Sequence, residues 1–436
     1  MVVRIGVEEE FHLVEVETGL LAPRAAAVLE GLPEETFTTE LQQAAVETNS
    51  AVHTSLDGMY RDITGSRRTL DAAASAHGLA VVSAGTVPLA RPDGAPPTPG
   101  DRYRRMVDEY RRIADEQLIC GTHVHVDVPD RDLAVRIMCE VSPWLPVLLA
   151  LSASSPYWQG ADTGYASWRT MLWHRWPTAG PVGCFADAGA YDTAVRGLVE
   201  SGVISDPGMI YYDIRPSDHQ QTLELRVCDS SPRAETVVLL AGLFRALVVE
   251  ARRRLEGSAG PRCEGRHEWL RAATWRAARS GLEGSLVHPE TRREASAAHV
   301  VRRLLAKVRP ALADSGDWPA VETLAKQALA DGGAARRMRR AAERDDLLAC
   351  TDLLITETRG RLGSRPAGRL LGPVPGPSRE VAGGASRAQP DGAPAHARAM
   401  GDPAALPPSP GHAGVAARAR PAGDPPRSRS ARTPGR

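Results

Sequence analysis

The segment GVEEEF at residues 6–11 lies within a longer stretch, residues 2–16, in which apolar and polar side chains alternate. Alternation with a period of two predicts a β-strand. Successive side chains of a strand point to opposite faces, so Glu8 and Glu10 share one face and Glu9 points to the other. Two carboxylates on one face repel each other unless a cation lies between them. The alternative is a solvated strand face. Because the flanking residues are apolar, as in a partly buried strand, the metal interpretation and this alternative are about equally supported.

A second segment, GTHVHVD at residues 121–127, lies in a predicted strand at residues 118–128. His123 and His125 are two residues apart, so both imidazoles project from the same face. This spacing is common in metal sites, but ordinary protein cores also contain it. Taken alone, the segment leaves both interpretations open.

Two further strands, at residues 209–215 and 222–228, are predicted to pair around a polar turn. The second contains the sequence TLELRVC, in which Glu224 and Arg226 share one face and leucine and valine occupy the other. A carboxylate beside a guanidinium is usually a salt bridge. In a site, the same pair offers a metal ligand and a fixed cation for a developing negative charge.

The rest of the body mixes helical and strand signals, which predicts an α+β fold. The expected elements are helices at 56–76, 101–116 and 130–153 (the last bent at its prolines), a strand at 79–87, a loop rich in Trp and Tyr at 154–183, and about five amphipathic helices within 233–361.

Charge divides the 436 residues into two unlike parts. The 53 basic and 53 acidic side chains cancel overall, but residues 364–436 carry +7 and residues 1–363 carry −7. The last 73 residues contain 14 prolines and no aromatic residue, so they cannot bury enough apolar area to fold alone. We therefore expect a catalytic domain at 1–363, mainly helical over 233–361, and a disordered tail at 364–436.

Composition also excludes several classes of function. Only Lys307 and Lys326 are lysines, and no Gly-Lys pair exists for a phosphate-binding loop of the Walker type. A balanced total charge argues against nucleic acid as the partner, and no window of 18 uninterrupted apolar residues predicts a membrane span. Six cysteines without a CxxC pair indicate reduced thiols. These features predict a soluble cytoplasmic protein.

The motifs occur together in an order that resembles the glutamate–cysteine ligase type 2 family, also called carboxylate–amine ligases. The resemblance runs from Gly6 to about Arg361. It rests on GVEEEF, ELQQAAVET at residues 40–48, CGTHVHV at residues 120–126 and IRPS followed by TLELRVCD, with YASWRT at residues 165–170 in support. From spacing alone, residues 40–49 also fit one face of a helix, whereas the resemblance favours a strand or turn there.

The resemblance implies an antiparallel sheet with a concave active-site face and helices on its outer side, as in glutamine synthetase and guanidino kinases. It implies ATP and Mg²⁺ as cofactors, with Mn²⁺ as a substitute. It implies metal ligands at Glu8, Glu10, Glu40, Glu47, His123 and Glu224, catalytic roles for Glu10 and Arg226, nucleotide contacts from Arg226 and Arg215, and a substrate carboxylate at Arg169. Asp127 stands where the resemblance predicts glycine.

The expected reaction is ATP-dependent formation of γ-glutamylcysteine through an acyl phosphate, with small molecules as partners and, at the level of the family, a homodimer. Alternatives are a ligase that uses another amine or carboxylate, a guanidino phosphotransferase, a binding protein without activity, and an amidohydrolase built on His123, His125, His174 and His219. The amidohydrolase would need a βα barrel and usually a bridging lysine, and the sequence predicts neither in the right region.

Overall fold

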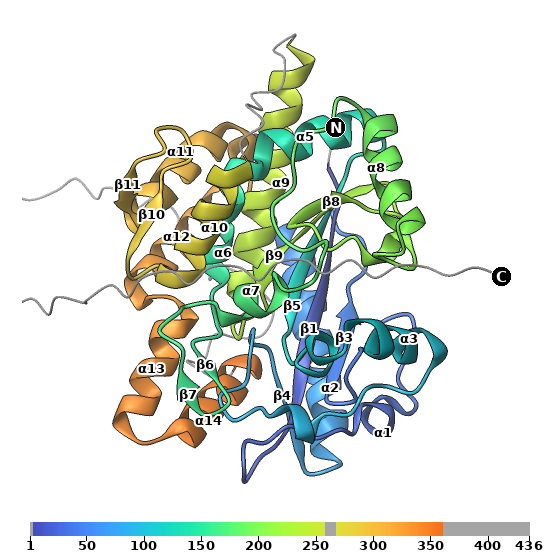
Figure 1. The fold of residues 1–436 in the computed structure, drawn as a ribbon. Helices are drawn as coiled ribbons and strands as arrows, with labels where there is room; N and C mark the ends of the chain where they lie inside the picture. Colours follow the sequence, from blue (N-terminus) through green and yellow to red (C-terminus); the bar gives the residue numbers. More distant parts are fainter. Residues whose placement is uncertain (1–2, 258–266, 361–436) are drawn as a thin grey trace, which may run out of the picture. The chain divides into compact units, whose positions relative to one another are not determined.

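The computed structural model describes residues 3–257 and 267–360, and its centre is a seven-stranded antiparallel sheet (Figure 1). Along the sheet the strands are β2 (Phe37–Thr39), β3 (Ala45–Asn49), β1 (Ile5–Glu15), β5 (Gly121–Asp127), β9 (Thr222–Asp229) and β8 (Ile214–Pro216). The remaining strand, β4 (Leu79–Val82), pairs with the C-terminal end of β1, residues 12–15. The predicted fold class, α+β around an antiparallel sheet, is confirmed.

Alternation along β1 places its side chains on two faces, as the sequence predicts. Ile5, Val7 and Glu9 are buried, whereas Glu8 and Glu10 lie on the other face and are partly accessible. The buried Glu9 forms an ion pair with Arg67 of α2 (Leu56–Ser75), at 2.5 Å between Nη2 and Oε1. The face that carries Glu9 is therefore the helix-covered back of the sheet.

The helices behind the sheet supply most of the core. The longest, α9 (Ala234–Glu256), packs against β1 and β5 and against α2, α5 (Arg131–Val141) and α6 (Leu145–Ser152). The predicted bend in the 130–153 helix is confirmed, because a 3₁₀ turn, Ser142–Trp144, separates α5 from α6. This stretch, Arg131–Ser152, is long and apolar enough to cross a membrane, but 78% of its most apolar window is buried inside the fold, as in a core helix.

The later part of the chain is mainly helical, as predicted. After α9 come α10 (His267–Ser280), α11 (Ala297–Asp314), α12 (Trp318–Asp331), α13 (Ala334–Arg344) and α14 (Leu347–Thr358). The prediction missed a small hairpin of β10 (Ser285–Val287) and β11 (Glu294–Ser296) between α10 and α11. Three residues per strand are too few to give a periodic signal.

Short elements complete the part of the chain that the structure describes. They are α1 (Ala25–Leu29), α3 (Asp101–Tyr110), α4 (Arg112–Asp115), β6 (Tyr157–Trp158), β7 (Ala161–Asp162), α7 (Trp168–Trp173), α8 (Ala188–Glu200) and the 3₁₀ turns Pro92–Gly94 and Pro207–Met209. The predicted helix at 101–116 breaks at Arg111, where φ is +52°. The strands predicted at 79–87 and 209–215 are shorter than expected, since β4 ends at Val82 and β8 begins at Ile214.

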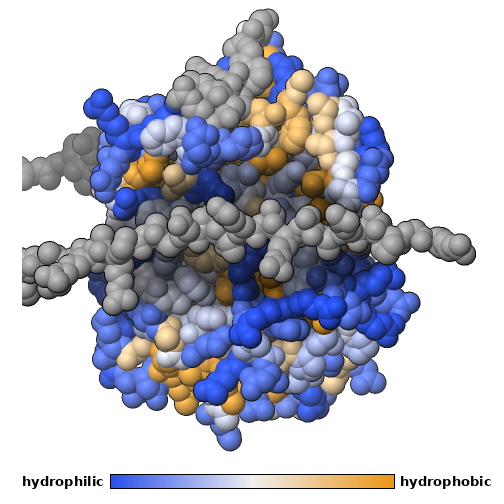
Figure 2. Space-filling view, in the orientation of Figure 1, coloured by the Kyte–Doolittle hydropathy of each residue, from blue (hydrophilic) through white to orange (hydrophobic). Residues whose placement is uncertain are grey.

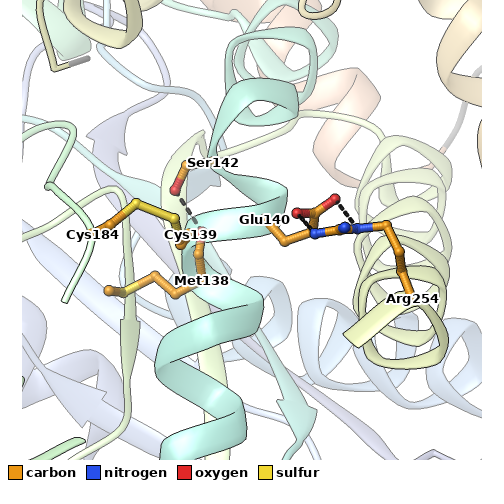
Figure 3. Close-up of a disulfide and its surroundings, with 6 residues drawn as sticks. All are labelled: Met138, Cys139, Glu140, Ser142, Cys184 and Arg254. Atoms are coloured by element: carbon orange, nitrogen blue, oxygen red, sulfur yellow. Dashed lines mark hydrogen bonds and ion pairs between the residues drawn. A yellow bond between two sulfur atoms is a disulfide. The ribbon is translucent and has the colours of Figure 1, made fainter. Parts of the chain in front are cut away.

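The prediction that all cysteines are reduced is wrong. Cys139 on α5 and Cys184, in the loop before α8, form a disulfide with their Cα atoms 5.4 Å apart (Figure 3). The neighbouring Glu140 points to the other side of α5, where it pairs with Arg254 of α9. The two cysteines are 45 residues apart, so their meeting depends on the tertiary fold and leaves no local pattern.

The three other described cysteines, Cys120, Cys228 and Cys350, are free and buried. The predicted tail at 364–436 lies outside the described residues. On the face seen in Figure 2, the coloured surface is mainly hydrophilic with scattered hydrophobic patches.

Candidate active site

Three adjacent strands bring the predicted ligands together on the face of the sheet opposite α9. Glu8 on β1 lies directly across from His123 on β5, and His125 lies across from Glu224 on β9. Glu8 therefore contacts both imidazoles, at 3.0 Å to His123 Nδ1 and 3.1 Å to His125 Nε2. Glu10 lies 3.8 Å from His123 Nε2. The pairing register of the sheet thus converts separate motifs into one cluster.

The ELQQAAVET segment, residues 40–48, reaches the same cluster from β3 and the bend before it. Glu47 lies opposite Glu10 in the pairing of β1 with β3. Thr38 donates a hydrogen bond to its carboxylate at 3.4 Å, and Asn49 donates another at 3.3 Å. Glu40 precedes the strand. The helical alternative for residues 40–49 is wrong, and the strand or turn that the resemblance favoured is found.

The cluster offers donor atoms that suit divalent cations. Three overlapping sets have their donors within 4.8 Å of one another: Glu8 with His125 and Glu224, Glu8 with Glu47 and His123, and Glu10 with Glu40 and Glu47. Carboxylate-rich sets with few imidazoles fit Mg²⁺ or Mn²⁺ better than zinc, which prefers thiolates and imidazoles. Sequence reasoning proposed His123 as a ligand but not His125, although the HxH spacing already indicated that both share a face.

Proton affinities support the same interpretation. Burial, and next the charge of Glu10, raise the pKa of Glu40 to about 8. Burial, and next the charge of Glu40, raise the pKa of Glu47 well above its usual range. These carboxyl groups hold protons because they are withdrawn from water and, secondly, because they lie close to other carboxylates, so a cation among them is favoured.

Glu8 and Glu224 are shifted the other way. Burial raises the pKa of Glu8, but hydrogen bonds to His123 and His125, together with their charges, bring it well below its ordinary value. Burial likewise opposes ionisation of Glu224, but the charges of Arg226 and Arg215 lower its pKa to about 2. Both groups are therefore ionised at neutral pH.

The two predicted phosphate-binding arginines flank Glu224 from different sides. Arg215 Nε donates to Glu224 Oε2 at 2.7 Å, and its Nη1 donates to two backbone carbonyls of the 208–210 turn. Arg226 also donates to the Glu224 carboxylate, while its buried Nε has no hydrogen-bond partner among the described residues. Arg226 lines the cavity in front of the carboxylates, whereas Arg215 lines a smaller neighbouring one with Arg131 and Tyr191.

The cavity has a volume of about 250 Å³ and a mixed lining. Glu8, Glu10, Glu40 and Glu47 line it together with Arg169. Its lining also includes aromatic side chains that the sequence reasoning did not assign: Tyr103, Trp173, Trp176 and Tyr211. The only sequence signal for them was the Trp- and Tyr-rich composition of residues 154–183.

Arg169, on the short helix α7, is 2% exposed, and its guanidinium carbon lies 5.7 Å from the centre of the Trp173 ring. No carboxylate among the described residues pairs with this guanidinium, and its Nε has no partner. The nearby buried carboxylate of Asp229 attracts this guanidinium electrostatically. Because no carboxylate pairs with it directly, the buried Nε donor is available to an anionic ligand.

Three other residues considered from the sequence lie apart from the cluster. Asp127 ends β5 and forms an ion pair with Arg4. His174 lies 3.6 Å from the buried Asp213 rather than among the carboxylates. His219, in the turn between β8 and β9, belongs to none of the three ligand sets.

Comparison with known proteins identifies the family of the chain. The model of the glutamate–cysteine ligase family 2 matches residues 4–357. The chain belongs to this family. Its antiparallel sheet is not the βα barrel that the amidohydrolase alternative requires, so that alternative is wrong.

Relatives differ in how much of their own length the chain matches. A Frankia casuarinae protein with the provisional name glutamate–cysteine ligase 2-2 is 49% identical over 377 residues, which are 84% of this chain and 43% of that protein. A Mycolicibacterium smegmatis protein with the same provisional name is 49% identical over 361 residues, 81% of this chain and 89% of that protein. The chain spans less than half the length of the first of these relatives.

Two solved structures share the fold at low sequence identity. Glutamate–cysteine ligase of Francisella tularensis, solved in complex with AMP, superposes with a TM-score of 0.62 at 12% identity over 82% of this chain and 89% of that one. A bifunctional glutathione synthetase from Pasteurella multocida gives a TM-score of 0.64 at 16% identity, covering 82% of this chain and 52% of that one.

Proposed function

We propose that this member of the family is an ATP-dependent carboxylate–amine ligase that forms γ-glutamylcysteine from glutamate and cysteine. The observation that carries the proposal is the contrast within one cavity. Crowded carboxylates that favour divalent cations line the same cavity as the buried guanidinium of Arg169, whose Nε lacks a hydrogen-bond partner. The carboxylates suit metal-bound phosphate, and the guanidinium suits a substrate carboxylate.

The donor residues form two groups, each suited to one cation. Glu10, Glu40 and Glu47 form one group of oxygen ligands, and Glu8, Glu224 and His125 form another that includes a single imidazole. His123 lies between the groups through its contacts with Glu8 and Glu10. These residues would hold Mg²⁺, which when bound would supply positive charge to neutralise the phosphate oxygens of ATP.

The chemistry needs two steps because a carboxylate is a poor acyl donor in water. In the first, an oxygen of the glutamate γ-carboxylate attacks the γ-phosphorus of ATP, the bond from that phosphorus to the β–γ bridging oxygen breaks, and ADP leaves. Arg226, which lines the cavity with free hydrogen-bonding capacity at Nε, stabilises the charge that spreads over the phosphoryl oxygens.

In the second step, the amine nitrogen attacks the acyl carbon of the acyl phosphate. The C–O bond to phosphate breaks, inorganic phosphate leaves, and the amine loses its proton to solvent or to the departing phosphate. No side chain needs to act as a covalent nucleophile, so the buried thiols Cys120 and Cys228 have no part in the reaction.

Arg169 holds the second carboxylate of glutamate. Glutamate carries one carboxylate to be activated and another to be recognised, and a buried guanidinium that lacks a protein partner meets the second requirement. Arg215 contributes indirectly by fixing Glu224, and we propose that its guanidinium also faces the nucleotide phosphates.

A different amine is the second candidate for the same reaction. Part of the cavity lining is aromatic and bulky, and is made by Tyr103, Trp173, Trp176 and Tyr211. It suits an amine with an apolar side chain at least as well as the small thiol of cysteine.

The test is a screen of the purified protein with ATP, Mg²⁺, glutamate and a panel of amines. It follows ADP release and identifies products by mass spectrometry. We expect amine-dependent ADP release and the matching amide, with γ-glutamylcysteine among the products. Absence of amine-dependent ADP formation with every carboxylate tried would refute the ligase proposal.

A further inference from the structure

Two residues outside the cavity lining fix Arg169: Gly121 lies against its guanidinium, and Asp229 is linked to its backbone. Resting on the proposed function, we propose that Gly121 and Asp229 are positioning residues for Arg169, so that together they determine how tightly the substrate carboxylate binds. Gly121 leaves the space that the guanidinium occupies. Asp229 tethers the helix from which Arg169 projects.

Gly121 begins β5 and lies directly against Arg169. A Cβ atom at this position would be 2.3 Å from Nη2 of Arg169 and 2.9 Å from its Cζ, closer than real side chains approach. The backbone of Gly121 is itself fixed, because its amide donates to Glu10 and its carbonyl accepts from the Ser230 hydroxyl at 2.7 Å. Any added methyl group must therefore displace the guanidinium rather than the strand.

Gly121 therefore contacts both Glu10 and Arg169, which line the same cavity. Its amide orients the carboxylate of Glu10, and its Cα receives the side chain of Arg169. The separation of metal ligand and carboxylate-binding cation is set across this one residue.

Asp229 ends β9, the strand that also carries Glu224 and Arg226, and is completely buried. Its carboxylate accepts three hydrogen bonds: from the Ser154 amide at 2.9 Å, the Ser155 hydroxyl at 2.7 Å and the Ser167 hydroxyl at 2.7 Å. All three donors lie near the start of α7 in space, so the carboxylate fastens this helix to the sheet.

Two of the three serines continue the connection to Arg169. The Ser155 hydroxyl accepts from the backbone amide of Arg169 at 3.0 Å, and Ser167 caps α7 by accepting from the Thr170 amide at 3.3 Å. Asp229 therefore reaches Arg169 mainly through the backbone of α7. Its charge also attracts the guanidinium, although the two groups form no direct ion pair. The side chain stays available for a ligand while its base is fixed.

The first experiment compares Gly121→Ala with a matched control, Gly6→Ala. Gly6 lies on the neighbouring strand β1, where an added Cβ would find nothing nearer than 3.9 Å. We expect Gly121→Ala to raise the KM for glutamate at least tenfold, to leave the KM for ATP within about twofold, and to keep the wild-type Tm. Gly6→Ala should change none of these values. A KM split of this kind separates substrate positioning from general disruption.

A second variant tests the direction of the effect. Adding Arg169→Lys to Gly121→Ala places a slimmer cation beside the new methyl group. We expect the double variant to bind glutamate more tightly than Gly121→Ala, although Arg169→Lys alone should weaken binding. Additive losses in the double variant would count against the proposed contact.

The tether is tested with Asp229→Asn, which keeps the shape but exchanges one acceptor for a donor. It is also tested with Ser155→Ala, which removes both the hydrogen bond to Asp229 and the acceptor for the Arg169 amide. Both should raise the KM for glutamate more than the KM for ATP. If Asp229→Asn does not fold, Ser155→Ala decides the matter alone.

The outcomes separate this inference from the function on which it rests. A wild-type enzyme that turns over glutamate, together with folded Gly121→Ala and Ser155→Ala variants that keep its KM for glutamate, would overturn the positioning roles alone. A wild-type protein that activates no carboxylate would overturn the proposed function and this inference with it.

Discussion

Oε1 of Glu8 lies 3.1 Å from Nε2 of His125, and its other carboxylate oxygen lies 3.0 Å from Nδ1 of His123. One carboxylate thus contacts both imidazoles of the HxH motif and belongs to two of the three ligand sets. No other residue of the cluster pairs with both histidines at hydrogen-bonding distance in the described part of the chain.

Glu8→Gln should therefore abolish turnover while the fold stays intact. The amide keeps the size of the side chain but loses the negative charge that a divalent cation needs. We expect kcat to fall at least 100-fold, with an unchanged circular dichroism spectrum. The matched control is Glu15→Gln at the exposed end of the same strand, which should keep normal activity. Near-normal activity of Glu8→Gln would refute the metal assignment.

On the opposite face of the same strand, Arg67→Ala should destabilise the fold without directly touching the site. Arg67 is 3% exposed and binds both carboxylate oxygens of Glu9 and the backbone carbonyls of Ser231 and Pro232. Removing one partner leaves a buried charge uncompensated, which costs about 3–5 kcal/mol.

The control for Arg67 lies on the same helix. Arg61 pairs with Asp57 at the surface, 3.2 Å apart, and exposed pairs contribute only about 0–1 kcal/mol. Chemical denaturation of both variants measures the difference in the free energy of unfolding. Equal effects of Arg61→Ala and Arg67→Ala would contradict the importance of the buried pair.

These two faces of β1 also show how far sequence reasoning reaches. Strand alternation was enough to separate Glu8 and Glu10 from Glu9, because it is a local property of the backbone. It did not identify Arg67 as the partner of Glu9, since 58 residues separate them. The register that sets His125 opposite Glu224 likewise depends on long-range pairing, and the meeting of Cys139 with Cys184 has no local signature.

Binding of Mg²⁺ should depend on pH in a defined direction. Burial and the charge of Glu10 raise the pKa of Glu40 to about 8, so without metal this group gains a proton on folding. A carboxyl group with a raised folded-state pKa favours the folded state at low pH, and this contribution falls as pH rises from about 4.5 to about 8. A cation displaces the proton and reverses that loss.

The expected result is that saturating Mg²⁺ raises the Tm more at pH 8.5 than at pH 6, and that chelation with EDTA removes the difference. Glu40→Gln cannot release this proton, so its Mg²⁺-induced shift should vary less with pH. Thermal unfolding of both proteins at the two pH values measures the effect. An equal Mg²⁺ shift at both pH values in the wild type would contradict the linkage.

Cys184→Ser should lower stability while sparing catalysis. The disulfide joins α5, which packs against α9, to the loop before α8. The two cysteines are 45 residues apart in the sequence. Loss of such a cross-link typically costs about 2–4 kcal/mol, since the unfolded chain regains freedom. Neither cysteine lines the carboxylate cavity. We therefore expect a lower Tm, with KM values for glutamate and ATP close to those of the wild type. The control for serine substitution itself is Cys350→Ser, at a buried free thiol. A wild-type protein whose Tm is insensitive to reductant, with Cys184→Ser equally stable, would show that the bond contributes nothing to the fold.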